Sequence, residues 1–449
     1  MAEGFVKPIK GCTLEEVVDS YLVELNFCNM PLVIKRNEYG RPRRCKMHDL
    51  LWELALSLSN KEKFAAVHGD GGEMKECKAR HISIHKTHGE FEPFTSMSKL
   101  HSFLVFNKSL KTLPSGSKML RVLNLEDAPI DEFRDELFKL FNLRYLNLRG
   151  TLVKKLPNSI GRLLNLQTLD IRHTQIEALP HGIGNLENLW HLIMYRYTGN
   201  WNDFKYFIGM QAPSNIRRLK NLQTMCTLEA KGGLVRQIRS MTQLTSIGIG
   251  NVKEADEMDL CVSIQNMPHL RLMSIEVNNE EETLQMDALS SPPPKLQKLY
   301  LNGKLEKVPQ FLCSLQSLKD LQLHWSRMEE DLLPYIVALP ILGRLSLIKA
   351  YVGKQPCFIT GFPKLTELRI RNFPQLNEII IEEGVMPSVQ FLWIDSCMEL
   401  KTVPRGIEYL NLQKLFWTYA SMELKSCIEG EGSMDFPKVR NIPKIYIRL

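Results

Sequence analysis

The stretch from Leu120 to Trp190 decides the fold of this chain. It reads LRVLNLEDAPIDEFRDELFKLFN, then LRYLNLRGTLVKKLPNSIGRLLN, then LQTLDIRHTQIEALPHGIGNLEN and finally LW. Leucines 120, 143, 166 and 189 open these copies, so each step is 23 residues long. Each copy begins with L-x-x-L-x-L or a close variant. Self-similarity at this period predicts stacked coils, each with one short strand and one return segment.

The period and the motif are typical of a leucine-rich repeat. From Leu120 to Leu412 there are 12 steps over 292 residues, about 24 residues each. Two weaker openings, Ala79 and Leu100, come before them. The chain is therefore predicted to be an α/β solenoid, a leucine-rich-repeat horseshoe over 119–449, with a linker and degenerate first repeats at 66–118. The later openings are Leu222, Leu244, Leu270, Leu296, Leu318, Leu342, Leu365, Val389 and Leu412.

Strand alternation predicts which side chains of each repeat reach a partner. In LRYLNLRG, Leu146 and Leu148 are expected to point inward, whereas Tyr145, Asn147 and Arg149 point to the concave face. Aromatic and arginine side chains on a rigid face are favoured binding anchors; the alternative is that most of this row is simply solvated. Asp170 and Asp320 fall in the same row. The candidate partner-binding residues are Tyr145, Arg149, Arg172, Tyr300, Arg369, Phe391, Trp393 and Phe416, with Tyr300, Phe391, Trp393 and Phe416 expected to form one patch.

A different unit precedes the repeats. Apolar residues from Leu14 to Leu25 follow helical spacing, and a second helix is expected from Asp49, a suitable N-cap residue. Between the helices, Leu32–Lys35 has the character of a strand, and a turn at Asn37–Gly40 leads to a basic arm, Arg41–Lys46. Helix, hairpin and helix in this order predict a partial winged-helix domain at residues 1–65.

The charge on this hairpin leaves several interpretations open. Residues 35–46 hold six basic residues and one acid, a local charge of +5, while the whole chain carries +7. A basic wing can contact nucleic-acid phosphates. Alternatively, His48 helps to hold a nucleotide phosphate, because it lies just before a helix N-terminus and such termini favour anions. The third interpretation is a solvated hairpin with a surface histidine.

Other features argue against metal binding, catalysis and membrane insertion. Cys77, His81, His85 and His88 have ligand-like spacing, but His81 and His85 lie on opposite flanks of a short strand, so no zinc site is expected. No nucleophile and base lie in a catalytic motif, so the chain is not expected to be an enzyme. The ten cysteines are scattered, which is typical of reduced thiols inside a cell. No signal peptide or membrane span is expected.

Several motifs together resemble plant intracellular nucleotide-binding leucine-rich-repeat disease-resistance proteins, in particular the coiled-coil subtype. These are AEGFV at 2–6, RCKMHDLLWELA at 44–55 and ARHISIH at 79–85, combined with the L-P-x-x-I-x-x-L-x-x-L repeats. The resemblance covers essentially the whole chain, and Met47-His48-Asp49 matches the family's M-H-D motif. It implies that His48 senses the β-phosphate of ADP, that Asp49 supports the helix start, and that exchange of ADP for ATP activates the full-length receptor.

The chain departs from this family in one respect. It contains no G-x-x-x-x-G-K-[S/T] loop to cradle phosphates. We therefore expect it to correspond to the C-terminal portion of such a receptor, with nucleotide switching lost and no ADP or ATP as its own cofactor.

The resemblance implies a cytoplasmic protein of plant innate immunity. Its repeats are expected to recognise pathogen effectors or guarded host proteins, and to restrain a nucleotide-binding module in cis or in trans. Nucleic acid is not the expected partner. The alternative functions are a winged-helix nucleic-acid-binding protein and a leucine-rich-repeat adaptor. Apolar positions such as Leu22 and Leu25 on the first helix are expected to be exposed and to favour aggregation.

Overall fold

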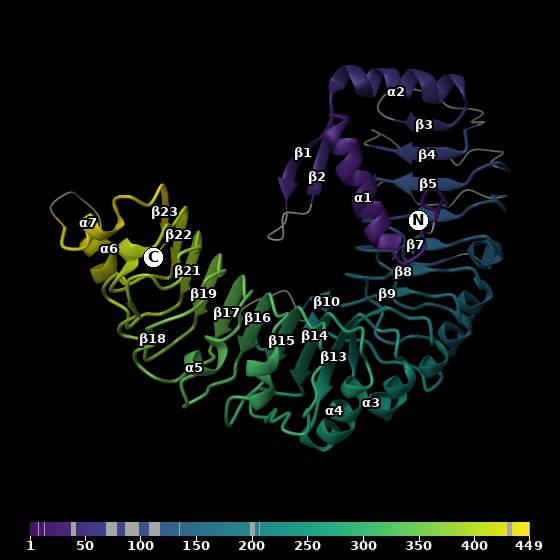
Figure 1. Ribbon diagram of the computed structural model, residues 1–449. Coiled ribbons are helices and arrows are strands. Elements are labelled where there is room, and N and C mark those ends of the chain that lie inside the picture. The colour runs from purple at the N-terminus through teal and green to yellow at the C-terminus, as the bar shows by residue number, and fades with distance from the viewer. Residues whose placement is uncertain are drawn as a thin grey trace. The chain divides into compact units, whose positions relative to one another are not determined.

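The structure is a computed structural model of the chain. It describes residues 1–449 except 8, 13, 37–41, 69–78, 86–97, 107–116, 134, 198–202, 206, 429–432 and 449, and at 15, 36, 42 and 43 it describes the backbone only. Two compact units make up the chain, Met1–Arg196 and Tyr197–Leu449, and each contains a run of parallel strands (Figure 1). No helix among the described residues is long and apolar enough to cross a membrane.

The first unit begins with the predicted helix, hairpin and helix. Helices α1 (Leu14–Phe27) and α2 (Asp49–Lys61) flank an antiparallel pair, β1 (Pro31–Arg36) and β2 (Pro42–Met47). The predicted basic arm is therefore largely a strand, and the predicted turn at 37–40 lies outside the described residues. Helix α2 buries none of its side chains and lies beside the first strand of the sheet (Figure 1).

A ladder of parallel strands follows in the first unit, each strand pairing with the next along the chain. Its first three strands fall within or beside residues 66–118, so the described part of the predicted linker already belongs to the sheet. The strands are β3 (Ala65–His68), β4 (His81–Ile84), β5 (Ser102–Val105), β6 (Val122–Asn124), β7 (Tyr145–Asn147), β8 (Thr168–Asp170) and β9 (His191–Ile193).

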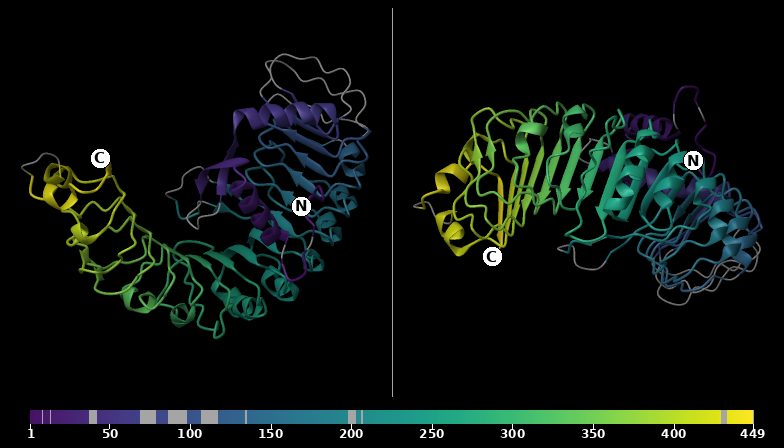
Figure 2. Two further views of the ribbon diagram at one scale, coloured as in Figure 1. Left: turned by 45° about the horizontal axis from the view of Figure 1, so that its top comes forward. Right: turned by 90° about the horizontal axis from the view of Figure 1, so that it is seen from below.

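The second unit repeats this arrangement with longer strands, which lie side by side in the view from below (Figure 2). Its main ladder consists of β12 (Thr224–Glu229), β13 (Ser246–Val252), β14 (Leu272–Val277), β15 (Lys298–Asn302), β16 (Asp320–His324), β17 (Arg344–Ile348), β19 (Glu367–Arg371), β21 (Phe391–Asp395), β22 (Lys414–Thr418) and β23 (Lys444–Arg448). The short strands are β10 (Arg196–Tyr197), β11 (Phe207–Ile208), β18 (Cys357–Phe358) and β20 (Ile380–Ile381). The helices are α3 (Leu234–Gln237), α4 (Glu257–Gln265), α5 (Leu333–Ile336), α6 (Met422–Ile428) and α7 (Phe436–Val439).

Every predicted repeat opening, from Ala79 to Leu412, leads into one strand of these two ladders, so the repeat prediction is confirmed. Strands β3 and β23 are not predicted by the repeat pattern, because neither contains a leucine motif. Strand β23 does follow the spacing I-x-x-I-x-I at Ile442, Ile445 and Ile447, with isoleucine at each leucine position of the motif.

Packing follows the predicted alternation. Leu146 and Leu148 are fully buried, and stacking of coil on coil provides the cover. The return side contains short 3-10 turns: Pro157 and Pro180 precede η2 (Asn158–Arg162) and η3 (His181–Asn185). Proline suits these positions because it has no N–H to donate.

Candidate partner-binding face

Seven five-residue strands of the main ladder present three rows of side chains on one face of the second unit. They are β15, β16, β17, β19, β21, β22 and β23. Their second and fourth residues are aliphatic or tryptophan and mostly buried, so the first, third and fifth form the rows. The first row is Lys298, Asp320, Arg344, Glu367, Phe391, Lys414 and Lys444. The middle row is Tyr300, Gln322, Ser346, Arg369, Trp393, Phe416 and Tyr446. The third row is Asn302, His324, Ile348, Arg371, Asp395, Thr418 and Arg448.

Three rings of the middle row form a continuous stack, which we call the aromatic ladder: Trp393, Phe416 and Tyr446. The Trp393 and Phe416 centroids are 3.7 Å apart with an interplanar angle of 7°, and those of Phe416 and Tyr446 are 4.8 Å apart at 6°. Arg369 covers the other end, with its Cζ 5.0 Å from the centre of the Trp393 ring. Cation–π and stacking contacts hold these side chains in one orientation. The face therefore offers a rigid aromatic row.

A charged network lies beside the ladder. Arg344 places Nη1 3.3 Å from Asp320 Oδ2 and Nε 3.1 Å from Glu367 Oε2, and Arg369 Nε is 2.5 Å from Glu367 Oε1. Burial raises the pKa of Asp320, although the Arg344 guanidinium opposes the rise. These charges are already satisfied inside the unit, so they orient Arg369 more than they attract a partner.

The expectation of one four-residue patch is wrong for Tyr300. Phe391, Trp393 and Phe416 lie on the adjacent strands β21 and β22, but Tyr300 lies on β15, four strands of the ladder before β21. Its hydroxyl donates to Asp320 Oδ2 at 3.0 Å. Tyr300 thus belongs to the charged network. The third ring of the ladder is Tyr446, which lies on the unpredicted strand β23.

The predicted residues of the first unit form a separate group. Arg149 Nη1 lies 2.9 Å from Glu126 Oε1, and Arg172 donates to both carboxylate oxygens of Asp170. Burial raises the pKa of Tyr145. All three side chains are only partly exposed, and the two arginines are paired within the unit.

Three polar positions of the predicted row are not exposed. Asn147, Asp170 and Asp320 are buried. Asn147 Nδ2 donates to Asn124 Oδ1 of the neighbouring coil at 2.6 Å, and its own Oδ1 accepts from the Arg149 N–H at 2.9 Å. Hydrogen bonds satisfy these buried polar groups: Asp320 accepts from Tyr300 of the preceding coil, and Asp170 accepts from Arg172 of its own coil. They stabilise the stack and do not face a partner.

His48 lies where the second helix begins, but the predicted N-cap is wrong by one residue. His48 itself caps α2, since its Nδ1 accepts a hydrogen bond from the Leu50 N–H at 3.3 Å. Asp49 is the first helical residue, where its charge still favours the helix dipole, and it lies 3.2 Å from Lys46 Nζ. His48 is exposed, and its Nε2 is the atom left to meet a phosphate.

The rejected zinc set is only partly described, because Cys77 and His88 lie outside the described residues. The structure instead brings Glu3, His81 and His101 together, with ligand atoms within 4.8 Å of one another. Burial raises the pKa of Glu3, and the charges of Arg121 and Arg144 oppose the rise. Two guanidinium groups this close disfavour a cation. The cluster instead joins the segment around Glu3 to the first repeats, because Ser102 and Arg121 donate hydrogen bonds to Glu3.

Comparison with known proteins identifies both parts of the chain. The family model described as leucine-rich repeat region matches residues 99–424. The family model described as disease resistance protein winged helix domain matches residues 1–55. Disease resistance protein RPM1 of Arabidopsis thaliana is 45% identical over 461 residues, 99% of this chain and 49% of the relative. Probable disease resistance RPP8-like protein 2 of the same plant is 26% identical over 475 residues, 99% of this chain and 50% of the relative. The chain thus spans about half the length of these relatives.

Solved structures support the fold. The leucine-rich-repeat ectodomain of the plant membrane receptor kinase GASSHO1/SCHENGEN3 from Arabidopsis thaliana, in complex with CASPARIAN STRIP INTEGRITY FACTOR 2, has a TM-score of 0.54. It is 19% identical, and the match covers 83% of this chain and 44% of that chain. None of these matches supports a nucleic-acid-binding winged helix or an adaptor. The chain belongs to the plant disease-resistance proteins in which a winged-helix domain is followed by leucine-rich repeats.

Proposed function

We propose that this chain is the recognition and restraint portion of a plant disease-resistance receptor. It acts in the cytoplasm by protein–protein contact and not by catalysis. The observation that carries the proposal is the aromatic ladder on one face of the second unit, with Arg369 over its first ring and Lys414 over the neighbouring Phe391 ring. Aromatic and arginine side chains that are already ordered bind a protein at a low entropic cost. The disease-resistance names of the relatives support the biological setting.

Two kinds of protein are the proposed partners. In the resting state the repeats bind a nucleotide-binding module, in cis or in trans, and restrain it. During infection they bind a pathogen effector or a guarded host protein. The candidate contact residues of the first unit, Tyr145, Arg149 and Arg172, are proposed to add a second contact area.

The proposal assigns no nucleotide to this chain alone. His48 fits a phosphate contact in part, because its Nδ1 already caps α2 and only Nε2 remains. Lys46, the cation closest to it along the sequence, pairs with Asp49. One imidazole nitrogen is not a nucleotide pocket, so ADP or ATP binding is proposed to need the nucleotide-binding module. Bound ADP would place a phosphate beside the N-terminus of α2, where the backbone favours an anion.

A retention experiment tests the restraint part of this function. The full chain is passed over the immobilised nucleotide-binding module of a related plant receptor, and the retained fraction is measured. We expect the chain to be retained, and the double variant Arg369→Glu, Phe416→Ala to bind about tenfold more weakly or worse, because loss of one buried anchor commonly costs over 1.4 kcal/mol.

Lys364→Glu is the matched control, because Lys364 is exposed and lies outside the three rows. It should bind like the original chain. Failure of the original chain to bind modules from several related receptors would count against restraint. Equal binding by the double variant and the control would move the contact away from the aromatic ladder.

A further inference from the structure

A short segment of the second unit lies on the carboxyl ends of neighbouring strands of its main ladder. We call residues 203–205 the strap. The Phe204 ring meets the ring of Trp325, which directly follows β16, edge-on, with the centroids 5.5 Å apart and an interplanar angle of 89°. The Phe204 carbonyl accepts a hydrogen bond from Nδ2 of Asn302, the last residue of β15, at 3.0 Å. Both the backbone and a side chain therefore hold the strap on this sheet.

Trp325 is the aromatic part of the surface under the strap. Lys349 Nζ lies 3.7 Å from the centre of its ring, and Arg327 Cζ lies 5.8 Å away. Together with Phe204 these groups leave Trp325 only 8% exposed. A tryptophan held in one orientation by cations is a suitable anchor for another aromatic ring. Removal of Phe204 would therefore uncover an ordered aromatic contact.

The strap satisfies the hydrogen bonds of this surface only in part. Asn302 Nδ2 donates to the Phe204 carbonyl and to Glu276 Oε2, each at 3.0 Å. Asn302 Oδ1, however, is buried and accepts a hydrogen bond from none of the described residues. A buried acceptor of this kind lowers stability. An extended segment presents the N–H and the C=O of one residue on the same side, so such a segment can pair with both atoms of this amide.

The neighbouring surface favours a basic side chain. Lys205 Nζ donates to Asn251 Oδ1 at the end of β13. The charge of Lys205 also opposes the rise in the pKa of Glu276, so the ammonium group lies near that carboxyl group. Oxygen acceptors on two neighbouring strands attract a cation. The surface therefore fits an aromatic residue that is followed by a lysine.

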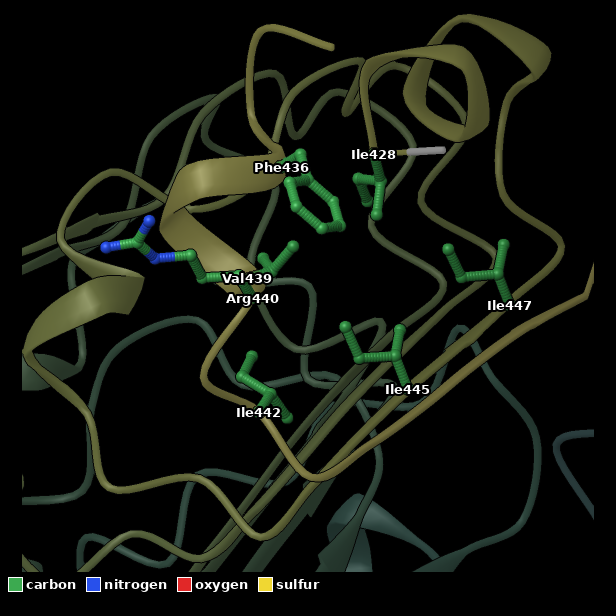
Figure 3. A pocket seen from close by; sticks show the side chains of 7 residues that line it. All are labelled: Ile428, Phe436, Val439, Arg440, Ile442, Ile445 and Ile447. Atoms are coloured by element: carbon green, nitrogen blue, oxygen red, sulfur yellow. The ribbon is translucent and has the colours of Figure 1, made fainter. Parts of the chain in front are cut away.

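This polar surface differs from the apolar cavity beside β23. That cavity has a volume of about 400 Å³, and isoleucines line it together with Phe436, Val439 and Arg440. The Arg440 guanidinium points away from the other side chains (Figure 3). The described lining thus lacks the polar groups that fix the orientation of a ligand. Beneath the strap, an indole ring, two amides and a carboxyl group supply them.

We propose that the strap is a replaceable occupant of a binding site for an extended segment of a partner protein. The segment carries an aromatic residue followed by a lysine. Its ring packs edge-on against Trp325, its lysine reaches Asn251 and Glu276, and the N–H and C=O of its aromatic residue pair with Asn302. The strap occupies the site until the partner displaces it. Apart from Asn302, these residues lie outside the three rows of the proposed function.

The test compares the original chain with the double variant Phe204→Ala, Lys205→Ala, which removes both anchoring side chains of the strap. The probe is a fluorescent heptapeptide with the core Asp-Phe-Lys between neutral residues, titrated by anisotropy. We expect the double variant to bind it saturably and the original chain to bind at least tenfold more weakly. The reason is that a strap within the same chain competes at an effective concentration of about 1 mM.

Changes in the peptide test the chemistry without altering the protein. Leucine in place of phenylalanine should weaken binding to the double variant about two- to tenfold, the usual effect of one aromatic pair. Glutamine in place of lysine should also weaken it. N-methylation of the phenylalanine amide should do the same, because the hydrogen bond to Asn302 Oδ1 is then lost.

Two further variants complete the test. Phe204→Ala alone should bind the peptide with an affinity between those of the original chain and the double variant, so the result does not depend on the folding of one protein. Trp393→Leu, added to the double variant, is the control. Trp393 lies in the aromatic ladder, so its loss should leave the affinity for the peptide unchanged.

Four outcomes would overturn the proposal. The first is no saturable binding by either strap variant, and the second is equal binding by the original chain and the double variant. The third is equal affinity for the original and the altered peptides. The fourth is loss of binding with Trp393→Leu, which would place the peptide on the aromatic ladder. Retention of the chain by a nucleotide-binding module is measured separately, so these outcomes leave the restraint function untouched.

Discussion

Glu276 on β14 lies partly buried beneath a segment of its own chain. Its Oε2 accepts a hydrogen bond from Asn302 Nδ2 at 3.0 Å, and the same amide group donates to the Phe204 carbonyl at 3.0 Å. Burial raises the pKa of Glu276 to about 7, although the Asn302 hydrogen bond and the charge of Lys205 oppose the rise. The folded pKa lies above the ordinary value of 4.5. The stability contribution of this carboxyl group is therefore complete below pH 4.5 and is lost as the pH rises through 7.

Glu276→Gln is expected to change how the free energy of unfolding depends on pH. At pH 8 the variant should be more stable than the original chain by up to about 3 kcal/mol, because no ionised carboxylate is held away from water. Near pH 4 the two free energies should converge. Urea denaturation at pH 4, 6 and 8 measures the difference. Glu383→Gln, at an exposed position, is the control and should give a flat profile; a flat profile for Glu276→Gln would contradict the assignment.

Asn147 tests the buried polar contacts between coils. Removing its amide in Asn147→Ala leaves Asn124 Oδ1 without that donor and the Arg149 N–H without its acceptor. The expected loss is about 1–3 kcal/mol of unfolding free energy, the usual cost of unsatisfied buried groups. Asn165→Ala is the matched control, because Asn165 makes one exposed hydrogen bond, to the Phe141 carbonyl. Equal losses in the two variants would show that the Asn147 contact is no more than a surface bond.

At the scale of elements, the aromatic ladder couples β21, β22 and β23. Phe416 is its central ring, so Phe416→Leu removes two stacked pairs at once. Each pair contributes about 0.5–1.5 kcal/mol beyond burial, which predicts a loss of about 1–3 kcal/mol. The urea midpoint measures it. Tyr409→Leu, at an exposed ring outside the ladder, should lose much less, and an equal loss would mean that the stacking adds nothing.

The strands of the solenoid could be predicted because their signal is local. Alternation of leucine with polar residues defines both the strand and its buried side, as Leu146 and Leu148 show. The exposure of the polar residues in these strands is harder to predict from the sequence. Asn147 and Asp170 have the same character as exposed residues, and only their contacts with neighbouring residues show that they are buried.

Which side chains are neighbours on the binding face depends on the order of the coils, and not on residue type. Residue type alone places Tyr300 with Trp393, yet four steps between strands of about 4.8 Å each separate them. The leucine pattern does not predict Tyr446 as a member of the row, because its strand has isoleucine where the other repeats have leucine. A residue's row follows from its place in the repeat, whereas its neighbours follow from the order of the coils.

At the scale of the whole molecule, exposed apolar surface sets the solution behaviour. Helix α2 exposes Leu50 by 71%, Leu54 by 54% and Leu58 by 52%. On α1, Leu25 is exposed as the sequence predicts, while Leu22 is half-buried. No side chain of α2 is fully buried, so these three leucines gain little from packing within their own unit. Contiguous apolar surface of this kind favours association with other molecules.

The full chain is therefore expected to self-associate as its concentration rises, and the triple variant Leu50→Gln, Leu54→Gln, Leu58→Gln to remain monomeric over a wider range. Glutamine is chosen because it keeps the helix propensity close to that of leucine. Light scattering across a concentration series measures the mass. The control triple Phe141→Gln, Leu152→Gln, Leu164→Gln removes exposed apolar side chains from the repeats. If both triples reduce association equally, the cause is apolar surface in general, and a monomeric original chain at every concentration would remove the role assigned to α2.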